Sequence, residues 1–418
     1  MAQTATTTEA AESVESFRSR VRAWVQAGGL PLLPEGEQWD PINSDDDHAS
    51  RARELQRMIW DGGFAGICYP TQYGGLGLTI DHQKAYDEET AGHELPFIFA
   101  NPTHSICGPT ILDCGTEEQR QRYIRPFLRG EELWVQFMSE PSGGSDMAGA
   151  LSTATRDGDI FLLNGSKIWS TYAYRADFAL CLARTDWSVP KHRGLTMFMV
   201  PIHQPSITIQ HIQMVDGNKE FCQEFFDDVV LTQDNVLGEV NDGWTIANRL
   251  LFHERMAVGA ASPYVSVPYA AGTEQSIQEL VEAARRAGRV DDPLARQLVG
   301  RAETTDTISL QLTERIRAGL ETGYFAGPAG SIARLYEGGA RTERASITFE
   351  LTGADALMFG GPADRRTGLE FVQRQRSCIG GGTTEMARNI ISERIMGMPR
   401  ERTPDKDIPF SEVQRGSK

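Results

Sequence analysis

The period of the apolar residues changes twice along the chain. Up to about residue 130 the apolar positions recur with a helical period, and between about residues 131 and 238 shorter alternating runs are typical of strands. From residue 244 onward the helical period returns over long segments with short breaks. The sequence therefore predicts an α+β fold with an N-terminal α-helical domain (residues 1–130), a middle β-domain (131–238) and a C-terminal helical bundle (239–418).

The N-terminal region carries two clear helix signals. One apolar stripe consists of Val14, Phe17, Val21, Trp24 and Val25. A second signal lies in GTEEQRQRYIRPFL, where Thr116 can cap a helix whose first turn is acidic and whose later positions carry arginine. Before the stripe, the Ala/Thr-rich first dozen residues are expected to be disordered.

The middle region is expected to form a compact β-domain of about seven or eight strands. Asn164-Gly165 is a strong hairpin signal, and the flanking runs Phe161–Leu163 and Lys167–Trp169 are the strands that it would join. Further predicted strands are Phe178–Arg184, Leu195–Pro201, Ile207–Met214 and Gln223–Val230.

The C-terminal region is expected to form long helices in an antiparallel bundle. The predicted helices are Trp244–Val258, Thr273–Ala287, Pro293–Leu320, Ala329–Leu351, Gly368–Arg376 and Thr384–Met396.

Composition and charge exclude several classes of partner. The chain has 57 acidic and 41 basic residues and a net charge of −16, which opposes nucleic-acid binding and gives no polybasic membrane patch. No apolar run is long enough to span a bilayer, and the N-terminus lacks the features of a secretory signal or a mitochondrial presequence. Six scattered cysteines without a CxxC pair favour a reducing cytoplasm, and eight histidines without an HxxxH or HxH cluster give little support to a metal site.

Glu254 stands on the apolar side of a predicted helix. The stripe that it interrupts consists of Ala247, Leu250, Leu251 and Val258. A carboxyl group in apolar surroundings has a raised pKa and can accept a proton near neutral pH. The alternative is a buried ion pair with an arginine or lysine from another helix.

Three further segments contain residues that suit a bound cofactor. Phe137–Asp146 (FMSEPSGGSD) ends a strand in a Ser/Gly-rich turn, and Asn164–Thr171 (NGSKIWST) sets a tryptophan beside two hydroxyl groups. Ile379–Arg388 (IGGGTTEMAR) sets three glycines before a helix N-terminus, a common way to hold a phosphate. Taken singly, the first two have an ordinary structural alternative: a plain turn for the first segment, and a core tryptophan on a strand for the second.

Taken together and in order, these segments resemble the acyl-CoA dehydrogenase flavoprotein family. The resemblance runs from about Met58 to Arg400 and includes SEPSGGSD, LNGSKIWST, FFDDV, the NDGW…ER helix and GGTTEMARNIISERIMGMPRE. It implies an N-terminal helical domain, a β-barrel-like middle domain and a C-terminal four-helix bundle around FAD and an acyl-CoA thioester. It also implies α,β-dehydrogenation to a trans-2-enoyl-CoA, with an electron-transfer flavoprotein as the usual acceptor.

The resemblance assigns roles to residues that match the family's motifs. Phe137, Met138 and Ser139 are expected along the flavin ring, Trp169 near its face and Thr171 near N5. The remaining matches are Ser145 at the pyrophosphate or CoA side, Thr383 and Glu385 at the phosphate side of FAD, and Arg255 close to the CoA and the base.

Two departures from the family pattern affect these expectations. The best-known members carry the base in a C-terminal Tyr-Glu-Gly-Thr turn, where this chain has Gly380-Gly381-Gly382-Thr383. A smaller group carries it on the helix that here holds Glu254-Arg255, so Glu254 is the expected base. In ARRAGRVDDP the usual Phe-Gly is absent, which puts in doubt the contact to the FAD of a neighbouring subunit.

Two alternatives to this function stay open at this point. One is a relative that passes electrons to oxygen, and the other is a partly catalytic subunit of a hetero-oligomer. A homotetramer or homodimer is the expected assembly otherwise. The acyl group is left open, with linear, branched and sterol-derived chains all compatible with the sequence.

Overall fold

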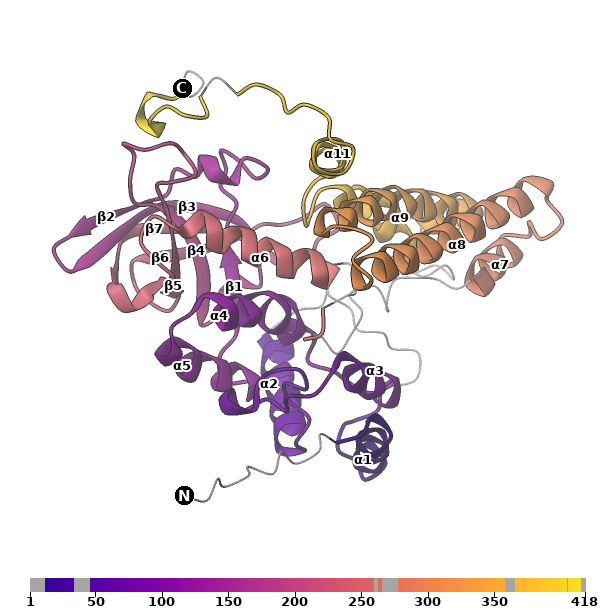
Figure 1. Cartoon of the computed structure of the whole chain (residues 1–418). Helices are drawn as coiled ribbons and strands as arrows, with labels where there is room; N and C mark the ends of the chain where they lie inside the picture. The colour runs from indigo at the N-terminus through magenta and orange to yellow at the C-terminus, as the bar shows by residue number, and fades with distance from the viewer. Residues whose placement is uncertain are drawn as a thin grey trace.

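The structure is a computed structural model that describes residues 12–33, 46–258, 262–264, 277–357, 365–403 and 405–414. It confirms the α+β class: the N-terminal and C-terminal parts of the chain are helical and the strands come between them in sequence, with the sheet and the C-terminal bundle on opposite sides of the view (Figure 1). The expected disorder of the first dozen residues falls almost entirely outside the described residues.

The N-terminal region is helical, as the apolar stripe predicted. Phe17, Val21 and Val25 are buried on one side of the first helix. Thr116 caps α5 in a reciprocal box, because its hydroxyl accepts from the Gln119 amide at 3.2 Å while the Gln119 side chain accepts from the Thr116 amide at 3.0 Å. The elements are α1 (Val14–Gln26), α2 (Asp46–Asp61), α3 (Ile80–Glu89), the π-helical η3 (Phe99–Cys107), α4 (Gly108–Cys114) and α5 (Glu117–Leu128).

The middle region forms one eight-stranded sheet, which confirms the expected number of strands. The strand order is β6-β7-β3-β2-β4-β5-β8, and β1 pairs in parallel with β4. The predicted strands Phe178–Arg184 and Leu195–Pro201 are β4 and β5 with the same bounds. The remaining strands are β1 (Trp134–Phe137), β2 (Thr153–Asp157), β3 (Ile160–Thr171), β6 (Ile207–His211), β7 (Phe221–Thr232) and β8 (Val236–Leu237).

The predicted hairpin at Asn164-Gly165 is wrong. Strand β3 runs straight through both residues, and its register against β7 shifts by one at this point. The Asn164 side chain reaches across to Asp228 on β7, donating to its carboxylate at 2.8 Å and accepting from its amide at 2.9 Å. Gly165 has φ +130° and no room for a Cβ, which would lie 2.8 Å from Ser152. The turn-type residues therefore build a β-bulge instead of a turn.

The C-terminal region is the predicted bundle, in which α9 lies against α7, α8 and α10 (Figure 1). The start of the predicted helix Thr273–Ala287 lies outside the described residues, and the predicted helix Thr384–Met396 changes to a π-helical segment at Ile391. The helices are α6 (Gly243–Val258), α7 (Ile277–Arg286), α8 (Pro293–Glu321), α9 (Gly330–Thr352), α10 (Arg365–Gln373) and α11 (Thr384–Ile390).

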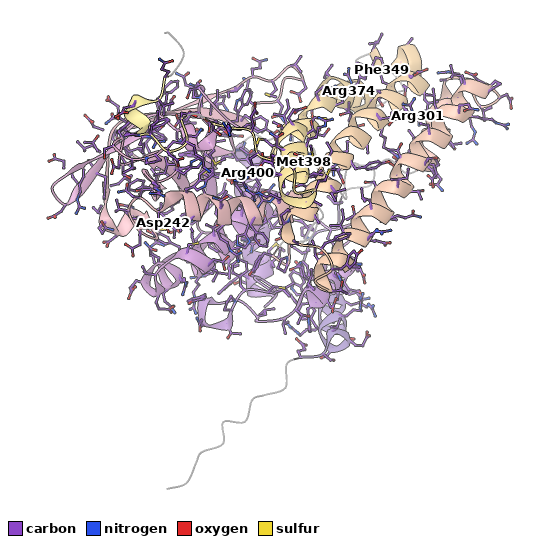
Figure 2. The ribbon with its side chains drawn as sticks, turned by 45° about the horizontal axis from the view of Figure 1, so that its top comes forward. Asp242, Arg301, Phe349, Arg374, Met398 and Arg400 are labelled. Atoms are coloured by element: carbon purple, nitrogen blue, oxygen red, sulfur yellow. The ribbon has the colours of Figure 1, made fainter. Side chains whose placement is uncertain are left out.

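After α11 the chain returns from the bundle to the sheet. In Figure 2, Met398 and Arg400 lie on this returning segment, while Arg301, Phe349 and Arg374 mark the bundle. The segment is fixed at Phe410, whose ring stacks on Trp187 at 5.4 Å. The C-terminal part of the chain thus closes over the β-domain.

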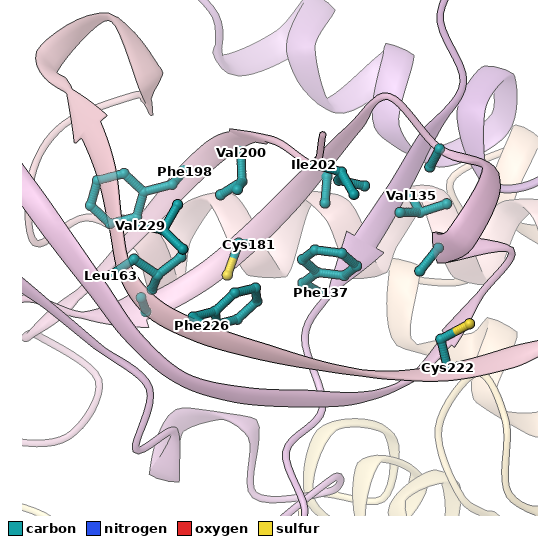
Figure 3. Close-up of a cluster of buried hydrophobic side chains, with 14 of the residues drawn as sticks. Val135, Phe137, Leu163, Cys181, Phe198, Val200, Ile202, Cys222, Phe226 and Val229 are labelled. Atoms are coloured by element: carbon teal, nitrogen blue, oxygen red, sulfur yellow. The ribbon is translucent and has the colours of Figure 1, made fainter. Parts of the chain in front are cut away.

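Two apolar cores meet at the sheet. One lies inside the curved sheet, where Phe137, Cys181 and Phe226 point toward one another (Figure 3). The other joins the outer face of β4 and β5 to α6 and to the N-terminal helices. Because α6 belongs to this second core, the position of its side chains is fixed relative to β1 and η3.

Candidate active site

The helix α6 places Glu254 against the end of strand β1. Ala247 and Leu250 are fully buried on the predicted stripe, and Glu254 follows one turn later with a partly buried side chain. Its Oε2 accepts a hydrogen bond from Nε2 of Gln136 on β1 at 3.2 Å. The predicted helix and its inward-facing acid are therefore found together, although the side chain of Val258 lies outside the described residues.

The surroundings of Glu254 favour its neutral form. Burial raises the pKa of Glu254, and the Gln136 hydrogen bond and the positive charges of Arg255 and Arg334 only partly oppose this effect. Within the described part of the chain no lysine or arginine forms an ion pair with its carboxylate, so its direct partner is an uncharged amide instead of the cation considered above. Oε1 of Gln136 is buried without a hydrogen-bond partner among these residues. The carboxyl group is thus available for proton transfer.

The residues that follow Gln136 differ in how they face this site. The Phe137 ring is fully buried in the core inside the sheet, 5.8 Å from the Phe226 ring (Figure 3). Its expected place along the flavin ring stays a prediction, and with the ring inside this core it is the Phe137 main chain that could take that role. Met138 is nearly buried, whereas Ser139 is partly exposed and its carbonyl accepts from the Ile168 amide at 3.0 Å.

That hydrogen bond brings the second predicted segment to the first. Trp169 follows Ile168, has φ 68° and is 51% exposed, so the alternative of a core tryptophan is wrong. Its ring meets the Phe221 ring edge-on at 5.9 Å. Thr171 lies two residues further at the end of β3 and is partly buried. An exposed indole beside a hydroxyl group offers a flat heterocycle both a face and a hydrogen bond.

A buried ion pair locks the two segments together. Nζ of Lys167 lies 2.8 Å from Oε1 of Glu140, and the two side chains are 0% and 4% exposed. Lys167 also donates to the Met138 carbonyl, and Glu140 accepts from the amides of Leu151 and Ser152. Burial alone would raise the pKa of Glu140, but Lys167 and the two amides lower it below the usual value. This pair could not be predicted from the sequence, where its two residues merely occur in separate motifs.

Part of the hydrogen-bonding capacity of the Ser/Gly turn in the first segment is used within the turn itself. The Gly143 amide donates to the Glu140 carbonyl at 3.0 Å, so this N–H is already used within the turn. Ser145 is exposed at the tip of the same turn, next to an Asp146–Lys191 ion pair of 2.8 Å. Its assignment to the pyrophosphate or CoA side stays a prediction.

Two arginines contact the glycine turn of the bundle. Arg334 on α9 donates to the Gly380 carbonyl at 2.6 Å, and its charge acts on Glu254. Arg376, just before the turn, forms an ion pair of 2.7 Å with Glu220 and lies 5.4 Å from the centre of the Phe221 ring. Since Phe221 also contacts Trp169, the turn is attached to the sheet next to the exposed indole.

The residues after the turn have the expected helix-start geometry. Thr383 caps α11 by accepting from the Met386 amide at 3.1 Å. Glu385 is exposed and pairs with Arg388 at 3.0 Å, and Arg255 is also exposed. The roles expected for Thr383, Glu385 and Arg255 stay predictions. Sequence reasoning missed Gln136 and Arg334, because neither belongs to a motif.

The described residues fit a flavin. The fit rests on the half-exposed indole of Trp169 in a left-handed backbone conformation, beside the Thr171 hydroxyl and near the Ser139 main chain. Beside Glu254, Oε1 of Gln136 is a buried acceptor without a hydrogen-bond partner among the described residues. None of the helices formed by the described residues combines the length and the apolar character that a membrane span needs.

The fold and this site define a flavin-dependent oxidoreductase of three domains. Family models for the N-terminal, middle and C-terminal domains of acyl-CoA dehydrogenases match residues 11–131, 136–229 and 241–396. The chain belongs to the acyl-CoA dehydrogenase family, whose members generally bind FAD.

Individual relatives support this assignment along the whole chain. Acyl-CoA dehydrogenase IpdE1 from Mycobacterium tuberculosis is 32% identical over 400 residues, which cover 93% of this chain and 99% of that protein. Acyl-CoA dehydrogenase FadE34 from the same organism is 32% identical over 82% of this chain and 46% of its own length. The solved structure of the Tcur3481-Tcur3483 steroid ACAD superposes with a TM-score of 0.75 at 25% identity, covering 94% of this chain and 100% of that chain.

Proposed function

We propose that the protein catalyses the FAD-dependent α,β-dehydrogenation of an acyl-CoA thioester and that Glu254 removes the α-proton. The observation that carries this proposal is the state of the Glu254 carboxyl group. It is partly buried, its direct partner is the neutral Gln136 amide, and its pKa is raised by burial. A carboxylate in such a position is a stronger base than one in water.

Each part of the chain has a defined task in this reaction. Glu254 in its carboxylate form takes the α-proton, and the Gln136 N–H holds one of its oxygens in a fixed direction. FAD, when bound, supplies the acceptor for the β-hydrogen, which leaves as hydride. The Trp169 face, the Thr171 hydroxyl and the Ser139 main chain would hold the ring, while Thr383 and the glycine turn would hold the phosphate side. Product is the trans-2-enoyl-CoA.

The substitution Glu254→Gln tests the base. It keeps the size and hydrogen-bonding capacity of the side chain but removes the proton acceptor. We expect the purified variant to bind FAD and to unfold like the parent, while anaerobic bleaching of its flavin by acyl-CoA slows by about 1,000-fold or more. Glu314→Gln, on the exposed face of α8, is the matched control and should bleach at the parent rate. Bleaching at the parent rate in Glu254→Gln would exclude Glu254 as the base.

The substrate and the acceptor are tested with the parent protein. An anaerobic titration should include straight-chain, branched and steroid-ring CoA esters, because one related structure is a steroid ACAD. Turnover with an electron-transfer flavoprotein and without peroxide would support a dehydrogenase. Peroxide formed without an added acceptor would instead support the oxygen-using alternative.

A second proposal concerns assembly. We infer that the chain forms a homotetramer or homodimer, or else pairs with an unlike chain, since the related Tcur3481-Tcur3483 structure is named after two chains. The mass in solution and the visible spectrum of the chain purified alone separate these cases. A yellow homo-oligomer that bleaches with acyl-CoA supports a self-sufficient enzyme, whereas a colourless chain that gains flavin only with a second subunit supports the hetero-oligomer.

A further inference from the structure

A buried carboxyl group, Glu224 on β7, lies inside the sheet beside Trp169 and has no part in the proposed chemistry. Its side chain is fully buried, and its Oε2 accepts from the Ser170 hydroxyl at 2.9 Å. Its Oε1 has no hydrogen-bond partner among the residues that the structure describes. The positive charge of Lys167, its cross-strand neighbour, also acts on it. A buried carboxyl group with only one side-chain hydrogen bond among the described residues still costs stability, so we expect it to have a structural role.

A structural role for Glu224 is suggested by the β-bulge at Trp169, because Ser170, the hydrogen-bond partner of Glu224, is the next residue. Strand β3 pairs Ile168 with Gln223 and Ser170 with Cys222, which leaves Trp169 without a partner on β7. In a regular strand, side chains alternate between faces, so Trp169 would share the interior with Lys167. The extra residue changes this phase: Lys167 and Ser170 are both buried, while Trp169 points outward.

This arrangement places Trp169 in a backbone conformation that its side chain disfavours. A non-glycine residue in the left-handed region, here with φ 68°, costs about 1–3 kcal/mol and persists only when its neighbours enforce it. On one side, the Ile168 amide is fixed by the Ser139 carbonyl. On the other, the only side-chain contact that the structure shows for the Ser170 hydroxyl leads to Glu224.

We propose that Glu224 is a positioning residue that fixes the Trp169 bulge by holding Ser170 inside the sheet. The indole then stays on the outer face with Thr171, where the proposed function places the flavin ring. The inference rests on that function for its consequence, but the anchoring itself concerns only this chain. Burial raises the pKa of Glu224 to about 8, so the protonated, uncharged form predominates at neutral pH.

The test uses three substitutions with graded effects on the hydrogen bond. Glu224→Gln keeps an oxygen that can accept from Ser170, whereas Glu224→Met and Ser170→Ala remove one partner each. Thr196→Val on β5 is the matched control, because Thr196 is equally buried and its hydroxyl bonds Thr185 at 2.7 Å in another part of the sheet. The substitution Trp169→Phe, introduced into each protein, isolates the fluorescence of this one tryptophan by difference.

The first measurement is acrylamide quenching of Trp169 in the protein freed of FAD. We expect the parent, Glu224→Gln and Thr196→Val to show an accessible Trp169, and Glu224→Met and Ser170→Ala to show a changed quenching constant. The second is FAD affinity, which should fall about tenfold or more in Glu224→Met and Ser170→Ala and stay near the parent value in Glu224→Gln. A group that merely fills space would be replaced equally well by methionine and by glutamine, so a difference between these two variants assigns the effect to the hydrogen bond.

The outcomes separate the two proposals. Unchanged quenching and FAD affinity in both Glu224→Met and Ser170→Ala would overturn the anchoring role, even if both unfold at lower temperature. Changed quenching with unchanged FAD affinity would confirm the anchor but remove Trp169 from the flavin site. A parent protein that binds no FAD would defeat the proposed function, while the quenching result would still decide the role of Glu224.

Discussion

The two walls of the candidate site are held in different ways. The sheet wall, with Ser139 and Trp169, is tied by a Lys167–Glu140 pair that is almost completely buried. The bundle wall, with the glycine turn, is tied to the sheet by Arg376 and held within the bundle by Arg334, and both side chains are partly exposed. The first wall is thus part of a folded core, and the second depends on a few polar contacts between domains.

This difference predicts how the walls respond to substitution. A buried charge that loses its partner keeps its desolvation cost, so damage to the sheet wall should appear as lost stability. A partly exposed charge can be rehydrated, so damage to the bundle wall should appear mainly as altered ligand binding and altered titration of Glu254.

Lys167→Met should destabilise the protein most. It leaves the Glu140 carboxylate buried without its cation, at an expected cost of about 3–5 kcal/mol in the free energy of unfolding. Denaturant unfolding of the FAD-saturated protein measures this cost. The double variant Glu140→Gln/Lys167→Met should recover part of the loss, because no unpaired charge remains. A loss below about 1 kcal/mol in the single variant would mean that the pair does not fix the sheet wall.

Glu224→Gln should change how stability depends on pH. The pKa of Glu224 is raised to about 8, above an unfolded value of about 4.3, so the folded parent loses stability as pH rises between these limits, by at most about 1.4 kcal/mol per pH unit. The variant has no such group and should gain relative to the parent from pH 5 to pH 8. The neighbouring Cys181 and Cys222 have pKa values raised to about 12 by burial and do not titrate in this range.

The same measurement includes its own control. The charge of Lys167 also acts on Glu224, but Lys167 is retained in the parent and the variant, so the difference between the two curves isolates position 224. Parallel curves over the whole range would show that Glu224 is ionised in the folded protein. The sheet wall would then contain an extra buried negative charge near the flavin position.

The strands β4 and β5 could be predicted from the sequence because nearly every residue in them is buried. The strands FALCLAR and LTMFMVP read as apolar runs because both faces of β4 and β5 are covered, by the inner core and by α6. Glu254 was found for the converse reason, as a charge on an otherwise apolar stripe. In both cases the pattern lies within a single helix or strand, so the spacing of apolar residues along the sequence is enough to detect it.

The wrong or missing predictions concern features whose structure depends on residues far away in the sequence. Asn164-Gly165 has the composition of a turn, but its side chain is satisfied by Asp228 on another strand, so a bulge forms. Gln136 is 118 residues away from Glu254, and no local pattern marks it as the partner of the base. The outward turn of Trp169 depends in the same way on Ser139 and Ser170 contacts across strands.

Arg376→Ala should have a smaller effect on stability than Lys167→Met. Its partner Glu220 is buried and burial already raises the pKa of that carboxyl, so the group can take a proton when the arginine is removed. With one partner 38% exposed, we expect a loss of about 1–2 kcal/mol. FAD titration should show weaker binding, since the glycine turn loses its attachment beside Phe221. A loss as large as that of Lys167→Met would place both walls in one core.

Arg334→Met should have the smallest effect on stability and the most specific effect on chemistry. The positive charge of Arg334 lowers the pKa of Glu254, which burial raises. Since the base must be ionised to accept a proton, the rate of flavin reduction by acyl-CoA should rise with pH in the parent. In Arg334→Met the midpoint of this rise should move to higher pH, because the carboxylate loses a stabilising charge.

A conservative variant separates charge from geometry at this position. Arg334→Lys keeps the charge but weakens the directed hydrogen bond to the Gly380 carbonyl, so its midpoint should stay near that of the parent. Arg341→Met on the same helix, where Arg341 pairs with Glu337 at 2.6 Å, controls for the loss of any cation from α9. If Arg334→Lys shifts the midpoint as far as Arg334→Met, the placement of the glycine turn, and not the charge of the arginine, sets the titration of Glu254. The bundle wall would then affect Glu254 through the position of the glycine turn. Its geometry would matter as much for the site as that of the sheet wall.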